Sequence, residues 1–225
     1  MTPATGLALA MLLTTVALAD LAADCAAGAP QGQYAACQQA LDAAPHDVRL
    51  KRLLALGMLL GGAEETAILA YRHLSEQSPE DADAHFQLAV AYGTVREFRN
   101  ALAPLDRALA LDPAHRDASR LSVIAHQQLG QFADAVPHLL RLAEAGDEIA
   151  MYELAVALER GAGLAANSVK AVHWFAKAAE AGHVAALDRL AEAYFTGQLG
   201  LRPDNARGND YATQARDARR GQLSR

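Results

Sequence analysis

Three prolines, Pro45, Pro79 and Pro113, lie 34 residues apart, and each follows an apolar stripe at helical spacing. Proline lacks a backbone N–H and its ring clashes with the preceding turn, so each stripe is expected to end as a helix at or just before its proline. A fixed period of this length is typical of proteins built from repeated units of two helices. The chain is therefore expected to stack such units one after another.

The composition of the 225 residues also favours an all-helical protein. Alanine and leucine dominate, only 5% of the residues are aromatic, and no Asn-Gly or Asp-Gly hairpin signal occurs. The net charge of -6 is mild and gives no reason to expect nucleic acid as a partner. The stretch from Arg202 is locally basic, and we interpret it as a fraying C-terminal helix followed by a flexible tail at 217–225.

Small and large apolar side chains recur at fixed positions within each 34-residue unit, as expected where two helices pack closely. In the unit that ends at Pro113 they are Leu88, Ala89, Tyr92, Ala101, Leu105 and Ala108. This pattern resembles the tetratricopeptide repeat, whose usual turn is Gly-x-Tyr/Phe-x-x-Ala. The turn is matched by "GQFADA" from Gly130 and in part by "REFRNA" from Arg96. The resemblance assigns residues 47–146 to tetratricopeptide-like repeats.

The pattern changes after residue 147. The stretch "AMYELAVALERGAGLAANSVKAVHWFAKAAEAG" carries its glycines and Trp174 at positions similar to those of a Sel-one-like repeat, a relative of the tetratricopeptide unit with a longer turn. A second unit follows, so the resemblance assigns 147–216 to Sel-one-like repeats. Two departures are expected to matter: Pro104 and Pro137 should kink or locally unwind their helices, and Gly208 should weaken the last helix by about 1 kcal/mol.

Together the resemblances imply an all-α fold, a right-handed α-α superhelix (solenoid) of tetratricopeptide-like and Sel-one-like hairpins. Residues 20–46 are interpreted as a capping helical hairpin around the turn segment "GAPQGQ". Cys25 and Cys37 lie symmetrically about this turn, so in an antiparallel hairpin they face each other. A disulfide is expected in an oxidising compartment, and two small buried thiols are the alternative.

Residues 1–19, "MTPATGLALAMLLTTVALA", contain no charged side chain and end in the small-x-small sequence Ala17-Leu18-Ala19. This is typical of a cleaved secretory signal peptide, and it predicts a periplasmic or secreted protein with no integral membrane span after cleavage. An uncleaved anchor and a buried first helix are the alternatives.

Nothing in the sequence predicts catalysis. The eight histidines are scattered, and no His-Glu-x-x-His or Cys-His cluster occurs. Gly161 and Gly163 lack the third glycine and the preceding strand of a dinucleotide site. We therefore expect no catalytic residue, no cofactor and no metal site.

Stacked hairpins of this family place their first helices along a concave groove, which is where a partner is expected. At the phase of the groove-facing positions the sequence alternates arginine with apolar residues, with Leu59, Asp83 and Asp117 beside them. The predicted partner-binding residues are Arg49, Arg52, Leu56, Phe86, Val90, Arg120, Ile124 and Gln127. Such a strip suits a protein or peptide with carboxylates and apolar anchors. Alternatively, the arginines only keep this face soluble.

The function predicted from these features is that of a non-catalytic scaffold or adaptor that binds protein or peptide partners in its groove. A structural subunit of a cell-envelope or polysaccharide-export assembly is the alternative, since some relatives with these repeats have that role. A cell-wall-modifying enzyme is a weaker alternative, because the N-terminal hairpin and the arginine-rich tail are too small to assemble a site.

Overall fold

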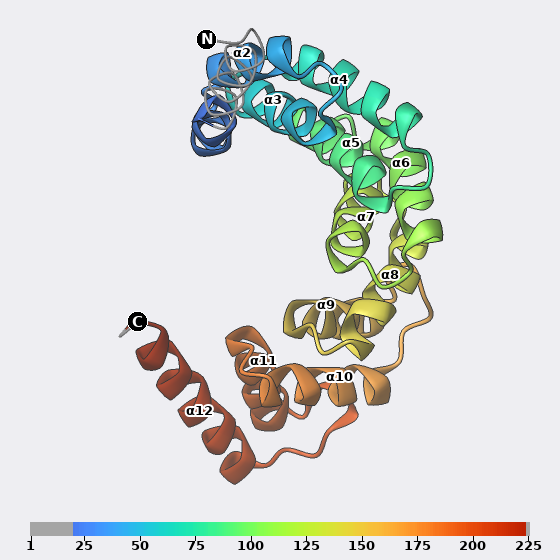
Figure 1. The fold of residues 1–225 in the computed structure, drawn as a ribbon. Coiled ribbons are helices and arrows are strands. Elements are labelled where there is room, and N and C mark those ends of the chain that lie inside the picture. The colour runs from blue at the N-terminus through green and yellow to red at the C-terminus, as the bar shows by residue number, and fades with distance from the viewer. Residues whose placement is uncertain (1–19, 224–225) are drawn as a thin grey trace, which may run out of the picture. The chain divides into compact units, whose positions relative to one another are not determined.

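A computed structural model describes residues 20–223, and all regular secondary structure in that range is helical (Figure 1). The all-α fold of successive hairpins is therefore confirmed. The predicted signal peptide at 1–19 lies outside the described residues. Within 20–223, no helix has both the length and the apolar character needed to cross a membrane.

The described chain divides into two compact units, the first ending at Ala114 and the second beginning at His115. In the first unit, helical residues 20–28, a short 3-10 turn and α2 form the N-terminal hairpin. Two further hairpins follow, α3 with α4 and α5 with α6. Each helix packs against the next along the chain from α2 to α6. The bounds are η1 (Ala29–Gln31), α2 (Ala35–Ala43), α3 (Val48–Leu60), α4 (Glu64–Gln77), α5 (Ala82–Thr94) and α6 (Phe98–Leu111).

The second unit contains three hairpins, and consecutive helices again pack together. The bounds are α7 (Arg116–Gln128), α8 (Phe132–Glu144), α9 (Glu148–Arg160), α10 (Ser168–Glu180), α11 (Val184–Thr196), η2 (Gln198–Gly200) and α12 (Asn205–Leu223). The last helix is longer than expected. Residues 217–223, interpreted from the sequence as a flexible tail, are helical because α12 continues along α11, to which Arg219 forms an ion pair with Asp188.

The helix ends follow the expected chemistry. α2, α4 and α6 each end within two residues of Pro45, Pro79 and Pro113. The first helix of every hairpin from α3 onward begins at a residue whose side chain accepts backbone N–H bonds. These N-cap residues are Asp47, Asp81, His115, Asp147 and His183.

α6 and α8 remain continuous across Pro104 and Pro137, so the local unwinding expected as one possibility does not occur. One missing backbone bond does not outweigh the buried contacts of Leu105 and Leu139. Gly208 is not a weak point of a fraying helix: a Cβ atom at this position would lie 2.5 Å from the Phe195 ring, so glycine permits α12 to approach α11.

The cores consist of alanines at the close approaches and larger side chains between them. In the first unit Tyr71 is 2% exposed, and burial raises its pKa to about 12, with Arg52 opposing the shift. In the second unit Phe175 is fully buried between α9 and α11 residues. Leu59, expected on the groove, is buried in the core instead.

The N-terminal hairpin is closed by the expected disulfide between Cys25 and Cys37, whose Cα atoms are 4.5 Å apart. Both cysteines are fully buried with Ala29 and Ala40, beside Leu50 and Leu54 of α3. The disulfide therefore lies in the small core that joins the first hairpin to the next one.

Candidate functional site

All eight predicted partner-binding residues lie on the first helices of hairpins, α3, α5 and α7, as expected. In the first unit, Arg49 is exposed, and the other four are half-buried: Arg52, Leu56, Phe86 and Val90. α3 and α5 belong to the first unit, whereas α7 belongs to the second.

Arg52 is joined to the neighbouring hairpin rather than left for a partner. Its guanidinium forms an ion pair with Asp81, the N-cap residue of α5. Burial favours a raised pKa for Asp81, but the backbone N–H of Ala84 and the Arg52 guanidinium hold it below the ordinary value. The Arg52 side chain therefore binds an internal carboxylate and links α3 to α5.

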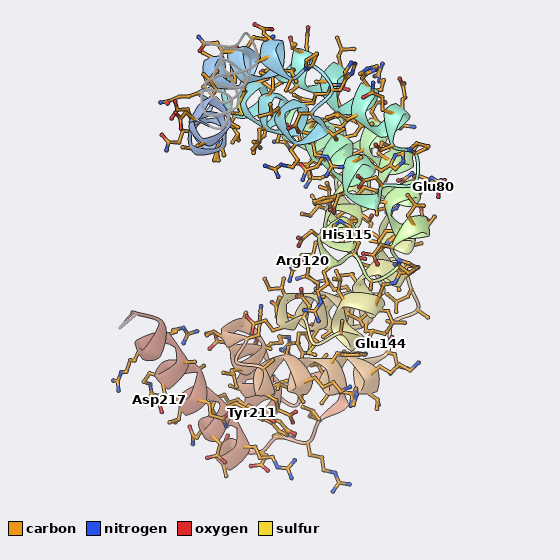
Figure 2. All side chains as sticks on the ribbon, viewed as in Figure 1. Glu80, His115, Arg120, Glu144, Tyr211 and Asp217 are labelled. Carbon is orange, nitrogen blue, oxygen red and sulfur yellow. A yellow bond between two sulfur atoms is a disulfide. The ribbon has the colours of Figure 1, made fainter. Side chains whose placement is uncertain are left out.

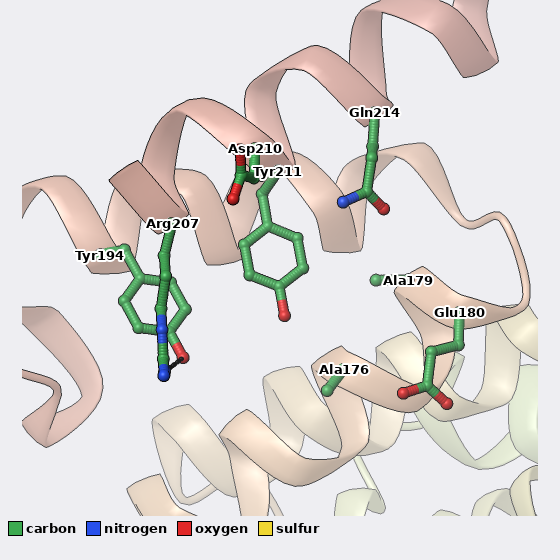
Figure 3. Close-up of a pocket in the computed structure, with 8 residues that line it drawn as sticks. All are labelled: Ala176, Ala179, Glu180, Tyr194, Arg207, Asp210, Tyr211 and Gln214. Atoms are coloured by element: carbon green, nitrogen blue, oxygen red, sulfur yellow. Dashed lines mark hydrogen bonds between the residues drawn. The ribbon is translucent and has the colours of Figure 1, made fainter. Parts of the chain in front are cut away.

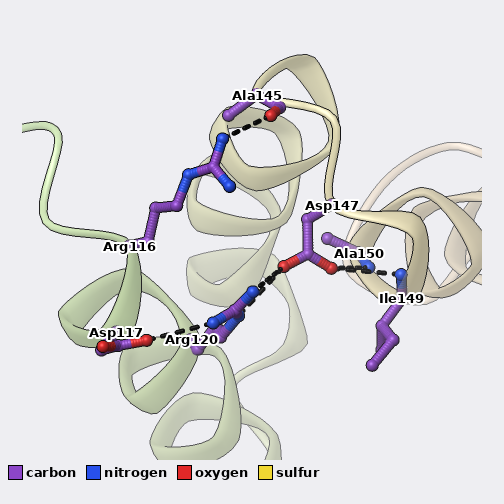
Figure 4. Close-up of polar contacts among 7 residues, drawn as sticks. All are labelled: Arg116, Asp117, Arg120, Ala145, Asp147, Ile149 and Ala150. Atoms are coloured by element: carbon purple, nitrogen blue, oxygen red, sulfur yellow. Dashed lines mark hydrogen bonds and ion pairs between the residues drawn. The ribbon is translucent and has the colours of Figure 1, made fainter.

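Arg120 has the same role in the second unit (Figure 4). It donates from Nε (2.9 Å) and Nη2 (2.7 Å) to Asp147 Oδ2, and from Nη1 (3.0 Å) to Asp117 Oδ1. The other oxygen of Asp147 accepts the backbone N–H groups of Ile149 and Ala150 at the start of α9. Burial works against ionisation of Asp147, yet these N–H groups and Arg120 together lower its pKa.

Two apolar cavities lie beside this ion pair, among α7, α8 and α9. Each has a volume of about 200 Å³. The first is lined by Arg120, Val123, Ile124, Leu139, Ile149 and Glu153, among others. The second is lined by Gln127, Phe132, Leu139, Glu153, Val156 and Arg160, among others. Three predicted residues thus line cavities: Arg120 and Ile124 the first, and Gln127 the second.

We call this surface the α7–α9 face and define it by the residues Arg120, Ile124, Gln127, Phe132, Ile149, Glu153, Val156 and Arg160. Its large apolar side chains are unusually accessible: Ile124 is 46% exposed, Phe132 49% and Ile149 57%. Gln127 donates to Glu153 Oε2 at 3.0 Å and links α7 to α9 within the face. The Arg160 guanidinium forms no hydrogen bond or ion pair with other residues in the described range.

The glycine-bearing turn after α9 fixes one end of the second cavity. Gly163 has φ +80°, and a Cβ atom there would lie 2.4 Å from the backbone carbonyl of Phe132. The turn therefore packs directly on the first residue of α8, and its neighbour Ala162 lines the cavity. The longer turn that distinguishes this hairpin thus shapes the face.

Sequence reasoning missed Phe132, Ile149 and Arg160. Ile149 and Arg160 lie on α9, the first helix of the next hairpin, so extending the groove-facing phase by one unit would have included that helix. Phe132 begins the second helix α8, where the Gly163 turn after α9 packs on its backbone. Within residues 20–223, no group of three or more histidine, cysteine, aspartate or glutamate side chains could hold a metal ion.

Comparison with known proteins agrees with this architecture. The Sel1 repeat family model matches residues 149–183 and 184–218, the last two hairpins. A Sel1 repeat protein from Oxalobacter formigenes is 25% identical with a TM-score of 0.54, covering 84% of this chain and 80% of that one. YrrB, described as a TPR protein with an unusual peptide-binding site, is 18% identical with a TM-score of 0.60, covering 82% of this chain and 93% of that one.

A curated relative, Chitin synthase regulatory factor 2 of Schizosaccharomyces pombe, is 36% identical over 62 residues, which are 28% of this chain and 12% of that protein. The fold thus defines a helical-hairpin repeat protein, a class that typically mediates protein–protein interaction and is generally non-catalytic. Within that class, the last two hairpins match the Sel1 repeat, and the chain has Sel1-repeat and tetratricopeptide-like structural neighbours.

Proposed function

We propose that this chain is a non-catalytic scaffold that binds an extended protein segment on the α7–α9 face. The supporting observation is the pair of apolar cavities, bordered by three large apolar side chains that are about half exposed. Contiguous exposed apolar surface with a polar rim is typical of interaction sites. A segment lying across both cavities would cover Ile124, Phe132 and Ile149.

The charges on the face specify the partner further. Arg120 is bound to Asp147 and Asp117, so it does not supply the carboxylate-binding group expected from the sequence. Arg160, at the rim of the second cavity, has no such internal partner in the described chain. The proposed partner segment therefore carries two apolar side chains, one for each cavity, and a carboxylate that reaches Arg160.

We further propose that the protein acts in the periplasm or is secreted. The buried Cys25–Cys37 disulfide supports this location, because such bonds persist in oxidising compartments. Sequencing the N-terminus of the mature protein tests it. A first residue at or near Asp20 is expected, whereas an intact Met1 in a cytosolic fraction would contradict the proposal.

A peptide-display selection on the full chain tests the binding function. Selected sequences are expected to contain two large apolar residues and an acidic residue. Ile149→Asp should weaken their binding at least about tenfold, since burial of one large apolar side chain contributes about 1.5 kcal/mol or more. Leu69→Asp is the matched control, because Leu69 is an exposed leucine on α4. Its binding should stay within about twofold of wild type.

Two results would contradict this function: no peptide is enriched, or enriched peptides bind both variants equally. If the chain is instead a permanent structural subunit of an assembly, a different outcome is expected in the cell. A partner cross-linked through a photoreactive residue at position 149 would then co-purify at fixed stoichiometry, whereas an adaptor would exchange between several partners.

A further inference from the structure

A separate cavity lies between α10, α11 and α12 and shares no lining residue with the cavities of the α7–α9 face (Figure 3). Its volume is about 320 Å³, within the range of small-molecule sites. Its polar and aromatic lining comes from Glu180, Tyr194, Arg207, Asp210, Tyr211 and Gln214. We call it the α10–α12 pocket.

The aromatic wall of the pocket is ordered by internal contacts. The rings of Tyr194 and Tyr211 stack with centroids 5.7 Å apart and planes inclined by 10°. The Arg207 guanidinium lies 5.5 Å from the Tyr194 centroid and donates to the Tyr194 hydroxyl at 3.2 Å. It also lies 3.5 Å from Asp204. The single cation of the pocket is therefore already paired with a phenol, a ring face and a carboxylate.

The two carboxylates of the pocket are not paired in this way. The carboxylates of Glu180 and Asp210 form no hydrogen bond or ion pair with any part of the chain that the structure describes. Figure 3 shows Glu180 and Arg207 on opposite sides of the opening, with Tyr211 between them. Burial and the neighbouring Tyr194 raise the pKa of Tyr211, and Glu180 adds to the shift against the opposing effect of Arg207.

We propose that the α10–α12 pocket binds a primary ammonium or guanidinium group. The lining carries two negative charges and one positive charge, so its balance is -1. Carboxylates pair with ammonium and guanidinium groups through charge-assisted hydrogen bonds, and a tyrosine ring attracts a cation to its face. An anion would meet two unpaired carboxylates and an arginine that already contacts Tyr194 and Asp204.

The small side chains on the floor of the pocket favour an elongated ligand. Ala176 and Ala179 line it from α10 and leave room for an alkyl chain beneath the Tyr211 ring. An alkylammonium chain can place its methylenes on this apolar floor and its charged end at Glu180, while Asp210 adds negative charge to the lining. The same group occurs in free diamines and in lysine side chains, and the two sources are separated by experiment.

Isothermal titration of the full chain at low salt tests the proposal. Cadaverine represents the free cation and the peptide Ac-Ala-Lys-Ala-NH2 the side chain, with Ac-Ala-norleucine-Ala-NH2 as the uncharged control. Cadaverine or the lysine peptide is expected to bind at least about tenfold more tightly than the norleucine peptide. Each carboxylate removed should weaken binding about fivefold, as for one charge pair near the surface.

The variants that locate the site are Glu180→Gln with Asp210→Asn, against Glu144→Gln as control. Glu144 is an exposed glutamate at the end of α8, and Figure 2 places it away from Tyr211. The double variant should weaken binding at least about tenfold, and the control should change it less than about twofold. Helicity by circular dichroism should match wild type in both variants.

The outcomes divide clearly. Binding of cadaverine without the lysine peptide identifies a free small cation as the ligand, and binding of the lysine peptide identifies a side chain of a protein. The proposal is overturned if neither cation binds, if the norleucine peptide binds equally well, or if the double variant binds like Glu144→Gln.

Discussion

The two units join neighbouring hairpins with the same arginine contact but place it in different surroundings. In each, an arginine on one first helix binds the aspartate that caps the next first helix: Arg52 with Asp81, and Arg120 with Asp147. The Arg52 and Asp81 side chains are 34% and 33% exposed. The Asp147 side chain is only 5% exposed, although Arg120 reaches into solvent. Burial of the carboxylate is the main difference between them.

Because of this difference in burial, the two ion pairs are expected to contribute different amounts to the free energy of unfolding. Solvent screens the Arg52–Asp81 pair, so it contributes little beyond the cap itself. Asp147 has lost its water, so its charge depends on Arg120 and the two backbone N–H groups. The second unit therefore tolerates loss of this contact less well than the first.

The units also differ in how they are closed. The first contains both cysteines of the chain, joined in the buried core of its N-terminal hairpin. The second contains none, and its last helix is held by side-chain contacts between α11 and α12. Stability of the first unit should therefore respond to reduction, whereas that of the second should not.

Removal of the disulfide should change stability most, and only in the first unit. Cys25→Ala with Cys37→Ala should lower the free energy of unfolding of the first unit by about 3 kcal/mol, as expected for opening a loop of this length. Hydrogen exchange measured by mass spectrometry should show faster exchange in α2 and α3 and no change in α11. Reduced wild-type protein is the control and should behave like the double variant. Equal loss of protection in both units would contradict the separation.

A second comparison concerns one close helical glycine in each unit. A Cβ atom at Gly57 would lie 2.6 Å from the Tyr34 Cβ atom, whereas at Gly208 it would meet only the Phe195 ring, which is 41% exposed and can turn away. Gly57→Ala should therefore destabilise the protein by about 2 kcal/mol and Gly208→Ala by about 1 kcal/mol.

Gly221→Ala is the matched control for these glycine variants, because a Cβ atom at this helical position meets nothing within 4 Å. Urea unfolding should show no loss for this variant, since alanine is the better helix former. If Gly208→Ala proved neutral as well, the close packing of α12 on α11 would be wrong.

The repeat period made most of the fold predictable. Helix ends at Pro45, Pro79 and Pro113 and the pairing of Cys25 with Cys37 follow from local chemistry and from symmetry about a turn. The role of Gly208 could not be predicted in the same way. Helix propensity predicts only that glycine weakens the helix. The close approach of α12 that glycine permits depends on Phe195, which lies on α11.

The helix face on which the candidate site residues lie could be predicted from the sequence. Which of these side chains are free to bind a partner could not. Helical periodicity correctly placed Arg120 and Ile124 on one face. It did not show that Arg120 is engaged, because its partner Asp147 is 27 residues away and comes beside it only through the stacking of hairpins. Phe132 and the cavity it lines depend on the Gly163 turn, whose contact lies in another hairpin.

Asparagine substitutions at the two capping aspartates sharpen the comparison of ion pairs, because asparagine retains the N-cap but removes the charge. Asp147→Asn should lower the free energy of unfolding by about 1.5 kcal/mol, as for loss of a charged hydrogen bond at a buried group. Asp81→Asn should cost less than about 1 kcal/mol, because its pair with Arg52 is screened. Equal costs would contradict the difference in burial.

The pH dependence of the same variants gives an independent measurement. Because the folded-state pKa of Asp147 is lowered, its contribution is complete above the unfolded value of about 3.9 and is lost as the pH falls through the folded value. The stability difference between wild type and Asp147→Asn should therefore be constant near neutral pH and shrink below about pH 4. A difference that persists unchanged in acid would exclude the charge as its cause.

Substitutions in the hairpin turns should change stability least. Arg96 in the first unit and Gly130 in the second lie one 34-residue period apart, with φ of 62° and 71°. A left-handed backbone costs a residue other than glycine about 1 kcal/mol, so Arg96→Gly should stabilise the first unit by up to about that amount. Gly130→Ala, where a Cβ atom has open space, should destabilise the second by a similar amount. Thermal unfolding of both variants checks the opposite signs. If Arg96→Gly were destabilising, the contacts of the Arg96 side chain would outweigh the backbone strain, and the two turns would not be equivalent.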